Sequence, residues 1–161
     1  MILEDIADFA AVLKPGRGVA GLDFGTKTIG VAVSDRLLSV ATPLSTLKRT
    51  KFTADAAQLA GIVADRELCG IVLGLPRNMD GSEGPRAQST RAFARNLSRL
   101  EPFAEMPITF WDERLSTVAA ERALLEADTT RKRRAEVIDA VAAGYILQGV
   151  LDRMRHIGAE R

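Results

Sequence analysis

The stretch that decides the fold of this chain is residues 19–33, Val19-Ala20-Gly21-Leu22-Asp23-Phe24-Gly25-Thr26-Lys27-Thr28-Ile29-Gly30-Val31-Ala32-Val33. It predicts two apolar strands joined by a tight turn, with one carboxylate, Asp23, set into the first strand. An ionised carboxylate in such a strand is costly unless it is paired, hydrogen-bonded or bound to a metal. The turn is built from Gly, Thr and Lys, residue types that approach phosphate closely. An acid beside such a turn indicates a metal held against a phosphorylated substrate.

Length and composition limit the possible classes of protein. A chain of 161 residues, 47% hydrophobic and 27% charged, is enough for one globular domain. No apolar run approaches the ~18 residues of a membrane span, and the acidic start of the chain does not resemble a signal peptide. We therefore expect no membrane partner. The single Cys69 excludes a disulfide framework and fits a reducing compartment, so we expect a cytoplasmic protein. A nucleophilic role for Cys69 is the alternative to a buried, inert thiol.

Hydrophobic periodicity and turn residues divide the chain into elements. We expect a short helical or frayed arm over 1–16, one domain over 17–155 and a tail over 156–161. Strands are predicted near 17–24, 29–35, 39–46, 71–75 and 107–111. Helices are predicted over 54–66, from Gly84-Pro85 to about residue 100, from Ser116 or Thr117 to about 126, and from 135 to about 155 after a basic loop over 127–134.

This order of elements predicts an α/β fold in three layers. The mixed five-stranded sheet has antiparallel first three strands, a parallel remainder and helices on both faces. Active sites of open α/β sheets lie outside the carboxyl ends of the parallel strands. Side chains at that edge are therefore the first candidates for a functional site.

Three acids occupy unusual settings relative to that edge. Asp23 ends the first strand, Glu113 follows the strand over 107–111, and Asp139 lies in a helix that is apolar almost all round. A buried helix crossing the edge could bring Asp139 beside the other two. Clustered carboxylates select Mg²⁺ or Mn²⁺ over zinc, and two such ions can drive phosphodiester cleavage. We therefore expect Mg²⁺ or Mn²⁺ as the cofactor.

Each acid also has a structural interpretation when taken alone. Asp23 could serve as a turn or cap residue. Asp112 and Glu113 could cap the helix that follows them. Asp139 could pair with an arginine of the basic loop. The lone His156, near the end of the chain, is interpreted as solvated.

Basic residues form two patches that could contact nucleic acid. Arg91, Arg95 and Arg99 recur every fourth residue and so line one face of a helix. Arg131, Lys132, Arg133 and Arg134 form a continuous block. The alternative for each patch is a solvated surface without a partner. The scarcity of aromatic residues argues against recognition of single strands by base stacking.

Four stretches in order carry a family resemblance: Asp23–Ala32, Gly74–Gly81, Asp112–Thr117 and Val137–Asp139 before an alanine-rich helix. Together they resemble the YqgF family over residues 17–152. That family is described as Holliday-junction resolvases and, in bacteria, as nucleases that mature the 5′ end of pre-16S rRNA. The resemblance implies an RNase H-like fold in which the catalytic, metal-binding acids are Asp23, Glu113 and Asp139.

The resemblance also implies contacts or supports at the site from Thr26, Lys27, Asn78 and Arg114. RNase H-like nucleases with two metals often have a fourth carboxylate, and Asp112 is the nearest candidate here. Activity with one metal is the alternative. Lys27 or Arg114 would neutralise the scissile phosphate, and the two basic patches would hold the nucleic-acid backbone.

We therefore expect a Mg²⁺-dependent or Mn²⁺-dependent endonuclease that acts on precursor ribosomal RNA. Resolution of four-way DNA junctions is the nearest alternative; it requires two coordinated cuts and so a symmetric dimer, whereas the sequence leaves monomer and homodimer open. A sugar-kinase or actin-like ATPase shares the phosphate-loop pattern, but that architecture needs two such domains. A non-catalytic RNA-binding assembly factor is the remaining alternative.

Overall fold

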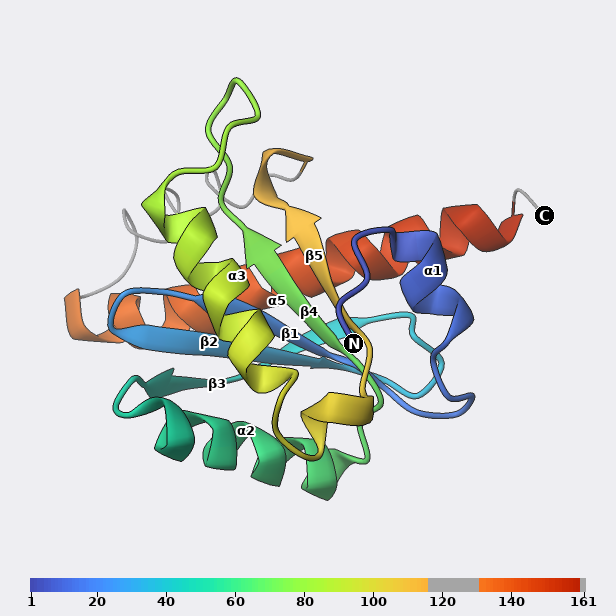
Figure 1. The fold of residues 1–161 in the computed structure, drawn as a ribbon, viewed down its shortest axis with the longest axis horizontal. Coiled ribbons are helices and arrows are strands. Elements are labelled where there is room, and N and C mark those ends of the chain that lie inside the picture. Colours follow the sequence, from blue (N-terminus) through green and yellow to red (C-terminus); the bar gives the residue numbers. More distant parts are fainter. Residues whose placement is uncertain (116–130, 160–161) are drawn as a thin grey trace.

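The computed structural model describes residues 1–115 and 131–159, with the side chains of the last helix described from Ile138 onward. Its centre is one five-stranded sheet (Figure 1). The strands are β1 (Ala20–Phe24), β2 (Thr28–Ser34), β3 (Ala41–Lys48), β4 (Ile71–Leu75) and β5 (Ile108–Asp112). They lie in the order β3-β2-β1-β4-β5. The pairs β1–β2 and β2–β3 are antiparallel, while β1–β4 and β4–β5 are parallel, as the sequence predicts.

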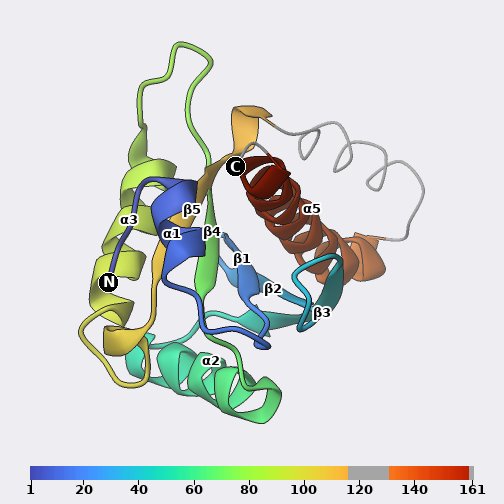
Figure 2. The same ribbon diagram turned by 90° about the vertical axis from the view of Figure 1, so that its right-hand side faces the viewer.

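Helices cover both faces of this sheet, which gives the three predicted layers (Figure 2). The helices are α1 (Ile6–Ala11), α2 (Phe52–Arg66), α3 (Pro85–Leu97) and α5 (Arg131–Ala159). Short 3₁₀ turns, which the sequence did not predict, span η1 (Phe103–Glu105) and η2 (Glu113–Leu115). Helices α2 and α3 lie on one face, and α5 lies on the other.

The alternation of side chains along the strands creates two separate apolar cores. In β1, Leu22 belongs to the core under α2 and α3, together with Phe93 of α3. Val19, just before β1, belongs to the core under α5, together with Ile146 of that helix. Because successive side chains of a strand point to opposite faces, Gly21 and Asp23 share the α5 face.

The N-terminal arm is helical and packed against the domain. Phe9 of α1 is fully buried in the core under α5. The residues before α1 run beside β5, where the Ile108 N–H donates to the Met1 carbonyl and the Leu3 N–H donates to the Ile108 carbonyl. Of the two predicted states of residues 1–16, the helical one is therefore confirmed.

Helix α5 begins earlier and ends later than the sequence analysis predicts. It starts at Arg131, so residues 131–134 are helical and the prediction of a loop there is wrong. Arginine and lysine are good helix formers, and their mutual repulsion in water is weak enough for the helix to include them. The helix also continues through His156 to Ala159. The predicted helix from Ser116 or Thr117 to about 126, and the loop over 127–130, lie outside the described residues.

No helix in the described part of the chain is both long enough and apolar enough to cross a membrane.

Candidate functional site

The position of Asp23 follows from the pairing of the first two strands. Asp23 is the penultimate residue of β1 and lies opposite Gly30 of β2 in the antiparallel register. Directly opposed residues of an antiparallel pair project from the same face. A Cβ atom at Gly30 would point into α5, 1.9 Å from the Asp139 carbonyl oxygen. Asp23 therefore projects toward α5, where it is 5% exposed.

The same contact places Asp139 at the turn end of the β1–β2 hairpin, beside the carboxyl end of β1. Gly30 lets the backbone of α5 approach β2 at Asp139 more closely than any side chain would allow. The Asp139 carboxylate accepts a hydrogen bond from the Thr28 hydroxyl at the start of β2. Thr28 was not among the predicted site residues. Thr28 belongs to the turn motif in the sequence. Its partner helix is brought near only by the tertiary fold, so the structure was needed to identify it as a site residue.

Glu113 lies on the same face of the sheet but comes from the end of β5, two strands away from β1. It begins η2, directly after β5. A Cβ atom at Gly74 of β4 would lie 3.1 Å from the Glu113 Oε1 and 2.4 Å from the Ile146 Cδ1 of α5. The Glu113 carboxylate therefore lies over Gly74, between β4 and α5. Gly74 follows Leu73, which pairs with Leu22 of β1, so it comes level with Asp23.

The fold thus brings all three predicted acids to one face of one edge, beneath α5. Asp23 comes from β1, Glu113 from the η2 turn and Asp139 from α5, three elements that are far apart in the sequence. In the described conformation, no group of three acidic, histidine or cysteine side chains within residues 1–115 and 138–159 is arranged to hold a metal ion. The acids share a surface, and the Asp139 carboxylate is turned to Thr28.

The turn that follows Asp23 is exposed and held by an arginine. Thr26 and Lys27 are exposed at the carboxyl end of β1. Arg49 donates from Nη1 to the Gly25 carbonyl at 2.7 Å and to the Thr26 carbonyl at 3.2 Å. Its guanidinium carbon lies 4.1 Å from the centre of the Phe24 ring. The sequence analysis missed Arg49, although pairing of Thr28 with Lys48 places it beside the turn.

The Asp112 carboxylate forms an ion pair with Arg114. The Arg114 backbone N–H donates to Asp112 Oδ1 at 3.0 Å, and its Nη2 donates to Asp112 Oδ2 at 2.7 Å. This hydrogen bond from the Arg114 side chain holds the pKa of Asp112 below its usual value. Asp112 therefore caps the η2 turn. The helix that the sequence analysis expected Asp112 and Glu113 to cap lies outside the described residues.

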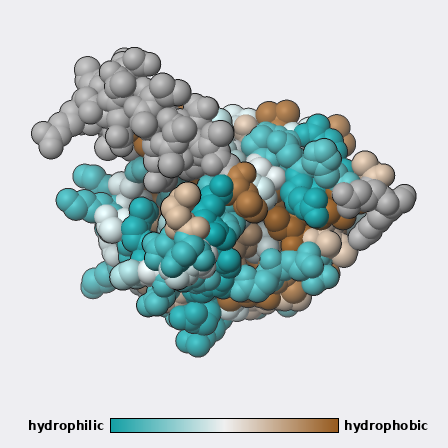
Figure 3. Space-filling model, turned by 90° about the horizontal axis from the view of Figure 1, so that it is seen from above, coloured by the Kyte–Doolittle hydropathy of each residue, from teal (hydrophilic) through white to brown (hydrophobic). Residues whose placement is uncertain are grey.

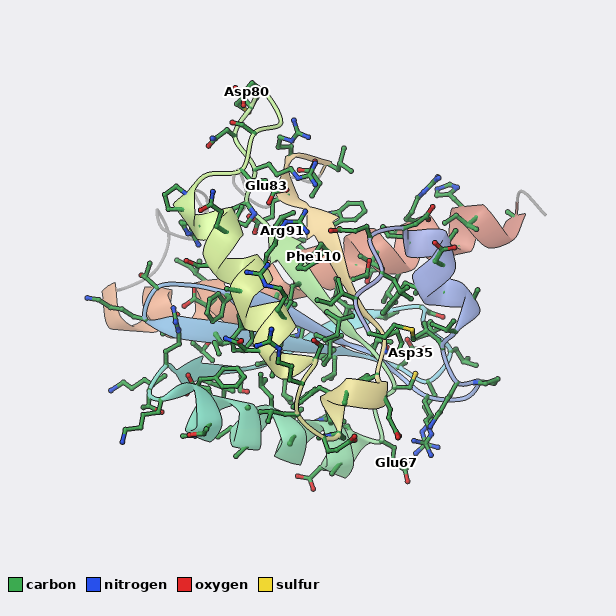
Figure 4. All side chains as sticks on the ribbon, in the orientation of Figure 1. Asp35, Glu67, Asp80, Glu83, Arg91 and Phe110 are labelled. Atoms are coloured by element: carbon green, nitrogen blue, oxygen red, sulfur yellow. The ribbon has the colours of Figure 1, made fainter. Side chains whose placement is uncertain are left out.

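Arg114 also connects η2 to the loop after β4, residues 76–84. This loop projects beyond the sheet edge, with Asp80 at its tip (Figures 1 and 4). Arg114 donates to the Met79 carbonyl at 3.4 Å. Asn78 is exposed, and its side-chain amide donates to the Ser82 hydroxyl at 2.9 Å. Asn78 and Arg114 thus shape the projecting loop beside the acids.

The three arginines of the first basic patch differ in their surroundings. Arg91 lies between Glu83 and Phe110 in Figure 4: its Nε is 2.6 Å from Glu83 Oε1, and it also pairs with Glu4. Arg95 is exposed on α3. Arg99 is exposed but lies beyond the helix, which ends at Leu97, so the stripe on one helical face is shorter than predicted. The Ser98 hydroxyl ends the helix by donating to the Arg95 carbonyl.

The other predicted residues are placed as follows. The side chains of Arg131, Lys132, Arg133 and Arg134 lie outside the described residues. Cys69 is buried near a cavity of about 310 Å³ that Lys14 and Arg17 also line. Burial raises the pKa of the Cys69 thiol, which opposes a nucleophilic role. His156 is exposed on α5, as expected.

Figure 3 views the molecule from above, toward the ends of β4 and β5. The described surface in this view is mostly hydrophilic, with smaller apolar patches between the polar side chains.

Comparison with known proteins places the chain in a family. Among curated proteins it is similar to a "Putative pre-16S rRNA nuclease" of Roseobacter denitrificans, with 74% identity over 161 residues, 100% of this chain and 98% of the relative. It is also similar to a protein of that name from Paracoccus denitrificans, with 73% identity over 158 residues and 98% of each chain.

Among solved structures, the chain is similar to Thermus thermophilus RuvC in complex with a Holliday junction substrate. The TM-score is 0.53 at 13% identity, over 86% of this chain and 96% of RuvC. A second Thermus thermophilus RuvC structure gives 0.52 at 15% identity, over 85% and 96%. At these identities the likeness shows the fold alone, which is RNase H-like as predicted.

The profile of the RuvX family, described as Holliday junction resolvase, matches residues 17–153. This match covers most of the chain and confirms the resemblance to the YqgF family. Together with relatives above 70% identity over their full length, it settles the assignment. The chain belongs to the RuvX family.

Proposed function

We propose that this chain is a metal-dependent endonuclease that cleaves precursor ribosomal RNA during maturation of the 5′ end of 16S rRNA. The observation that carries the proposal is the placement of Asp23, Glu113 and Asp139 on one face of the sheet edge. The names of the curated relatives favour precursor 16S rRNA as the substrate.

The residues at this edge fit Mg²⁺ or Mn²⁺. Their donors are carboxylate oxygens, which hard divalent cations prefer. Gly30 and Gly74 let the backbone of α5 and the Glu113 carboxylate approach the strands that flank Asp23. Asp23, Glu113 and Asp139 would hold the cation, and Thr28, which donates to Asp139 Oδ2, would leave the other lone pairs of that carboxylate for this contact. When bound, the cation would supply charge neutralisation and Lewis acidity at the phosphodiester.

The remaining side chains would bind and orient the substrate. Lys27, exposed in the turn after Asp23, could neutralise a phosphate at the edge. Thr26 would add a hydroxyl donor to the same phosphate. Arg114 already forms hydrogen bonds with Asp112 and with the Met79 carbonyl. Its role would therefore be to hold the loop over 76–84 beside the site. Exposed Arg95 and Arg99, with the block over 131–134, would bind the backbone without reading its sequence.

Resolution of four-way DNA junctions is the second candidate. It is favoured by the description of the RuvX family as Holliday junction resolvase. Two coordinated cuts require two sites related by symmetry. This candidate therefore predicts a stable homodimer, whereas a monomer or a homodimer could process RNA.

A side-by-side cleavage assay tests the proposal. The two substrates are a 5′-extended precursor 16S rRNA fragment and a four-way DNA junction, each with Mg²⁺, Mn²⁺ or a chelator. The proteins are the wild type, Asp23→Asn and the control Asp65→Asn, whose carboxylate is exposed on α2 away from the site. We expect RNA cleavage that needs the cation, is lost in Asp23→Asn and persists in Asp65→Asn.

Other outcomes have definite meanings. Paired symmetric cuts in the DNA junction alone would assign the chain to junction resolution. RNA binding without cleavage under every condition would identify a non-catalytic assembly factor. Equal cleavage by the wild type and Asp23→Asn would show that the acids are not the catalytic residues.

A further inference from the structure

Beside Glu113 lies a groove that the proposed chemistry does not use. It measures about 420 Å³ and runs between the end of β5 and the C-terminal half of α5. Its lining includes Trp111, Tyr145, Arg153 and His156. A volume of this size lies within the range of small-molecule sites, ~300–1,000 Å³, and accommodates a single nucleotide.

The floor of the groove carries an unsatisfied hydrogen-bond donor. Trp111 is 8% exposed, and its indole Nε1 is buried with no hydrogen-bond partner among the described residues. The indole lies against Gly149, another lining residue, where a Cβ would come 3.0 Å from Nε1. Buried donors nearly always have an acceptor. Because this atom is closed off from solvent, a ligand in the groove would provide the acceptor only when the side chains over Nε1 move aside.

Two exposed side chains on the rim of the groove, Arg153 and His156, can donate hydrogen bonds to an anionic ligand. The one carboxylate among the described lining residues, Asp152, already accepts hydrogen bonds from Gln148 at 3.0 Å and from Arg155 at 2.5 Å. The basic groups can therefore contact a phosphate, while Tyr145, 38% exposed, offers a partly open aromatic side chain to a base.

The groove lies next to the segment that carries Glu113. Trp111 and Leu115 line it, and Glu113 lies between them in the sequence. Ile146, which contacts the position of the Glu113 carboxylate over Gly74, is the neighbour of Tyr145 in α5. A strand whose phosphate lies at the acids would thus reach the groove with an adjoining nucleotide.

We propose that this groove is a subsite that binds one nucleotide of the RNA strand next to the scissile phosphate. The inference rests on the proposed nuclease function. In this subsite, Arg153 and His156 bind the phosphate, and Trp111 and Tyr145 contact the base or sugar. It differs from an open stacking platform because Trp111 is buried.

Trp111 is the single tryptophan of the chain, so its fluorescence reports on the groove directly. The experiment titrates the whole protein with a fluorophore-labelled single-stranded RNA that spans the precursor 5′ junction, with Ca²⁺ as the only divalent cation. Anisotropy of the label measures total binding, and Trp111 emission, followed with unlabelled RNA of the same sequence, measures occupancy of the groove. We expect a saturable change in emission with the same midpoint as the anisotropy.

Two variants separate contact from packing. Arg153→Gln should raise the RNA Kd about 5-fold to 10-fold. It should also reduce the slope of log Kd against log salt concentration by about one, because one fewer counterion is released on binding. Arg66→Gln, an exposed arginine on α2, is the matched control and should leave both unchanged. Trp111→Phe keeps a ring against Gly149 and removes the N–H donor. It should raise Kd by a smaller factor, and Tm is measured alongside.

The proposal is overturned if RNA saturates the protein by anisotropy while Trp111 emission stays constant, or if Arg153→Gln binds like Arg66→Gln. A change in emission caused by a four-way DNA junction and not by RNA would overturn the RNA assignment. The cleavage assay above is independent of these readouts. An emission response without cleavage would contradict the nuclease proposal alone, and cleavage without an emission response would contradict the subsite alone.

Discussion

At the scale of single residues, the site depends on positions where a side chain is absent. Gly30 and Gly74 allow α5 and Glu113 to approach the strands that flank Asp23. The sequence analysis placed the three acids at one edge but did not identify these glycines, because a glycine in a strand does not reveal which element approaches it. Thr28 and Arg49 were missed for the same reason, since each acts through a neighbour that is distant in the sequence.

The close approach at Gly30 predicts a large loss of stability on substitution. In Gly30→Ala the added Cβ would meet the Asp139 carbonyl oxygen at 1.9 Å, so backbone must move. We expect the free energy of unfolding in urea to fall by about 3 kcal/mol or more. Gly61→Ala is the control: nothing lies within 4 Å of that Cβ in α2, and alanine should add about 0.5–1 kcal/mol. A Gly30→Ala protein as stable as the wild type would contradict the packing of α5.

The hydrogen bond from Thr28 to Asp139 predicts a positioning role. Thr28→Val keeps the shape of the side chain and removes the donor, so unfolding free energy should change by only about 1 kcal/mol. The kcat for RNA cleavage should fall about 10-fold to 100-fold, because a misplaced catalytic group is costly. Thr28→Ser, which restores the hydroxyl, should recover most of the rate. If Thr28→Ser is as slow as Thr28→Val, the hydroxyl is not the cause.

The Glu83–Arg91 pair predicts a dependence of stability on pH. Hydrogen bonds from Arg91 hold the pKa of Glu83 below its usual value of 4.5. The pair therefore contributes fully above pH 4.5, and the contribution is lost as pH falls through the lowered pKa. Glu83→Gln should cost about 1–2 kcal/mol at pH 7, with the difference from wild type shrinking below pH 4.5. Urea unfolding between pH 3 and 7 measures this; a difference that stays constant over the range would contradict it.

At the scale of elements, α5 organises both the core and the site. It meets β2 at Asp139, β1 near Leu147 and β5 at Gly149. The sequence predicts its existence from a nearly continuous apolar surface, but its path over the sheet comes from tertiary packing. Its start at Arg131 was missed because a block of like charges was interpreted as a loop.

The packing of α5 predicts the cost of truncating its core side chains. Leu147 is fully buried, and its Cβ lies 2.6 Å from the position of a Cβ at Gly21. Leu147→Ala should therefore lower the free energy of unfolding by about 2–5 kcal/mol. The matched control is Leu37→Ala, at a side chain that is 85% exposed, which should change it by less than about 0.5 kcal/mol. Equal effects of the two substitutions would show that α5 is not docked as described.

At the scale of the whole molecule, the topology was predictable and the details of the site were not. Alternation, turn residues and the unbroken apolar strand over 71–75 sufficed for the directions of the strands and the three layers, whereas the order of the strands across the sheet comes from the structure. They could not reveal that Asp112 is held by Arg114 or that Arg91 is held by Glu83 and Glu4. Ion pairs of this kind depend on side-chain geometry that no spacing in the sequence encodes.

The most direct test of the central claim is whether the three acids act as one unit. Precursor RNA cleavage with Mg²⁺ is measured for the wild type, for Asp23→Asn, Glu113→Gln and Asp139→Asn, and for the double variant Asp23→Asn with Asp139→Asn. Circular dichroism verifies that each is folded. We predict that each single substitution lowers the rate by about 10³-fold or more, and that the double variant is no slower than the slower single variant. Small losses that multiply in the double variant, or unchanged cleavage in any folded single variant, would contradict a shared catalytic site.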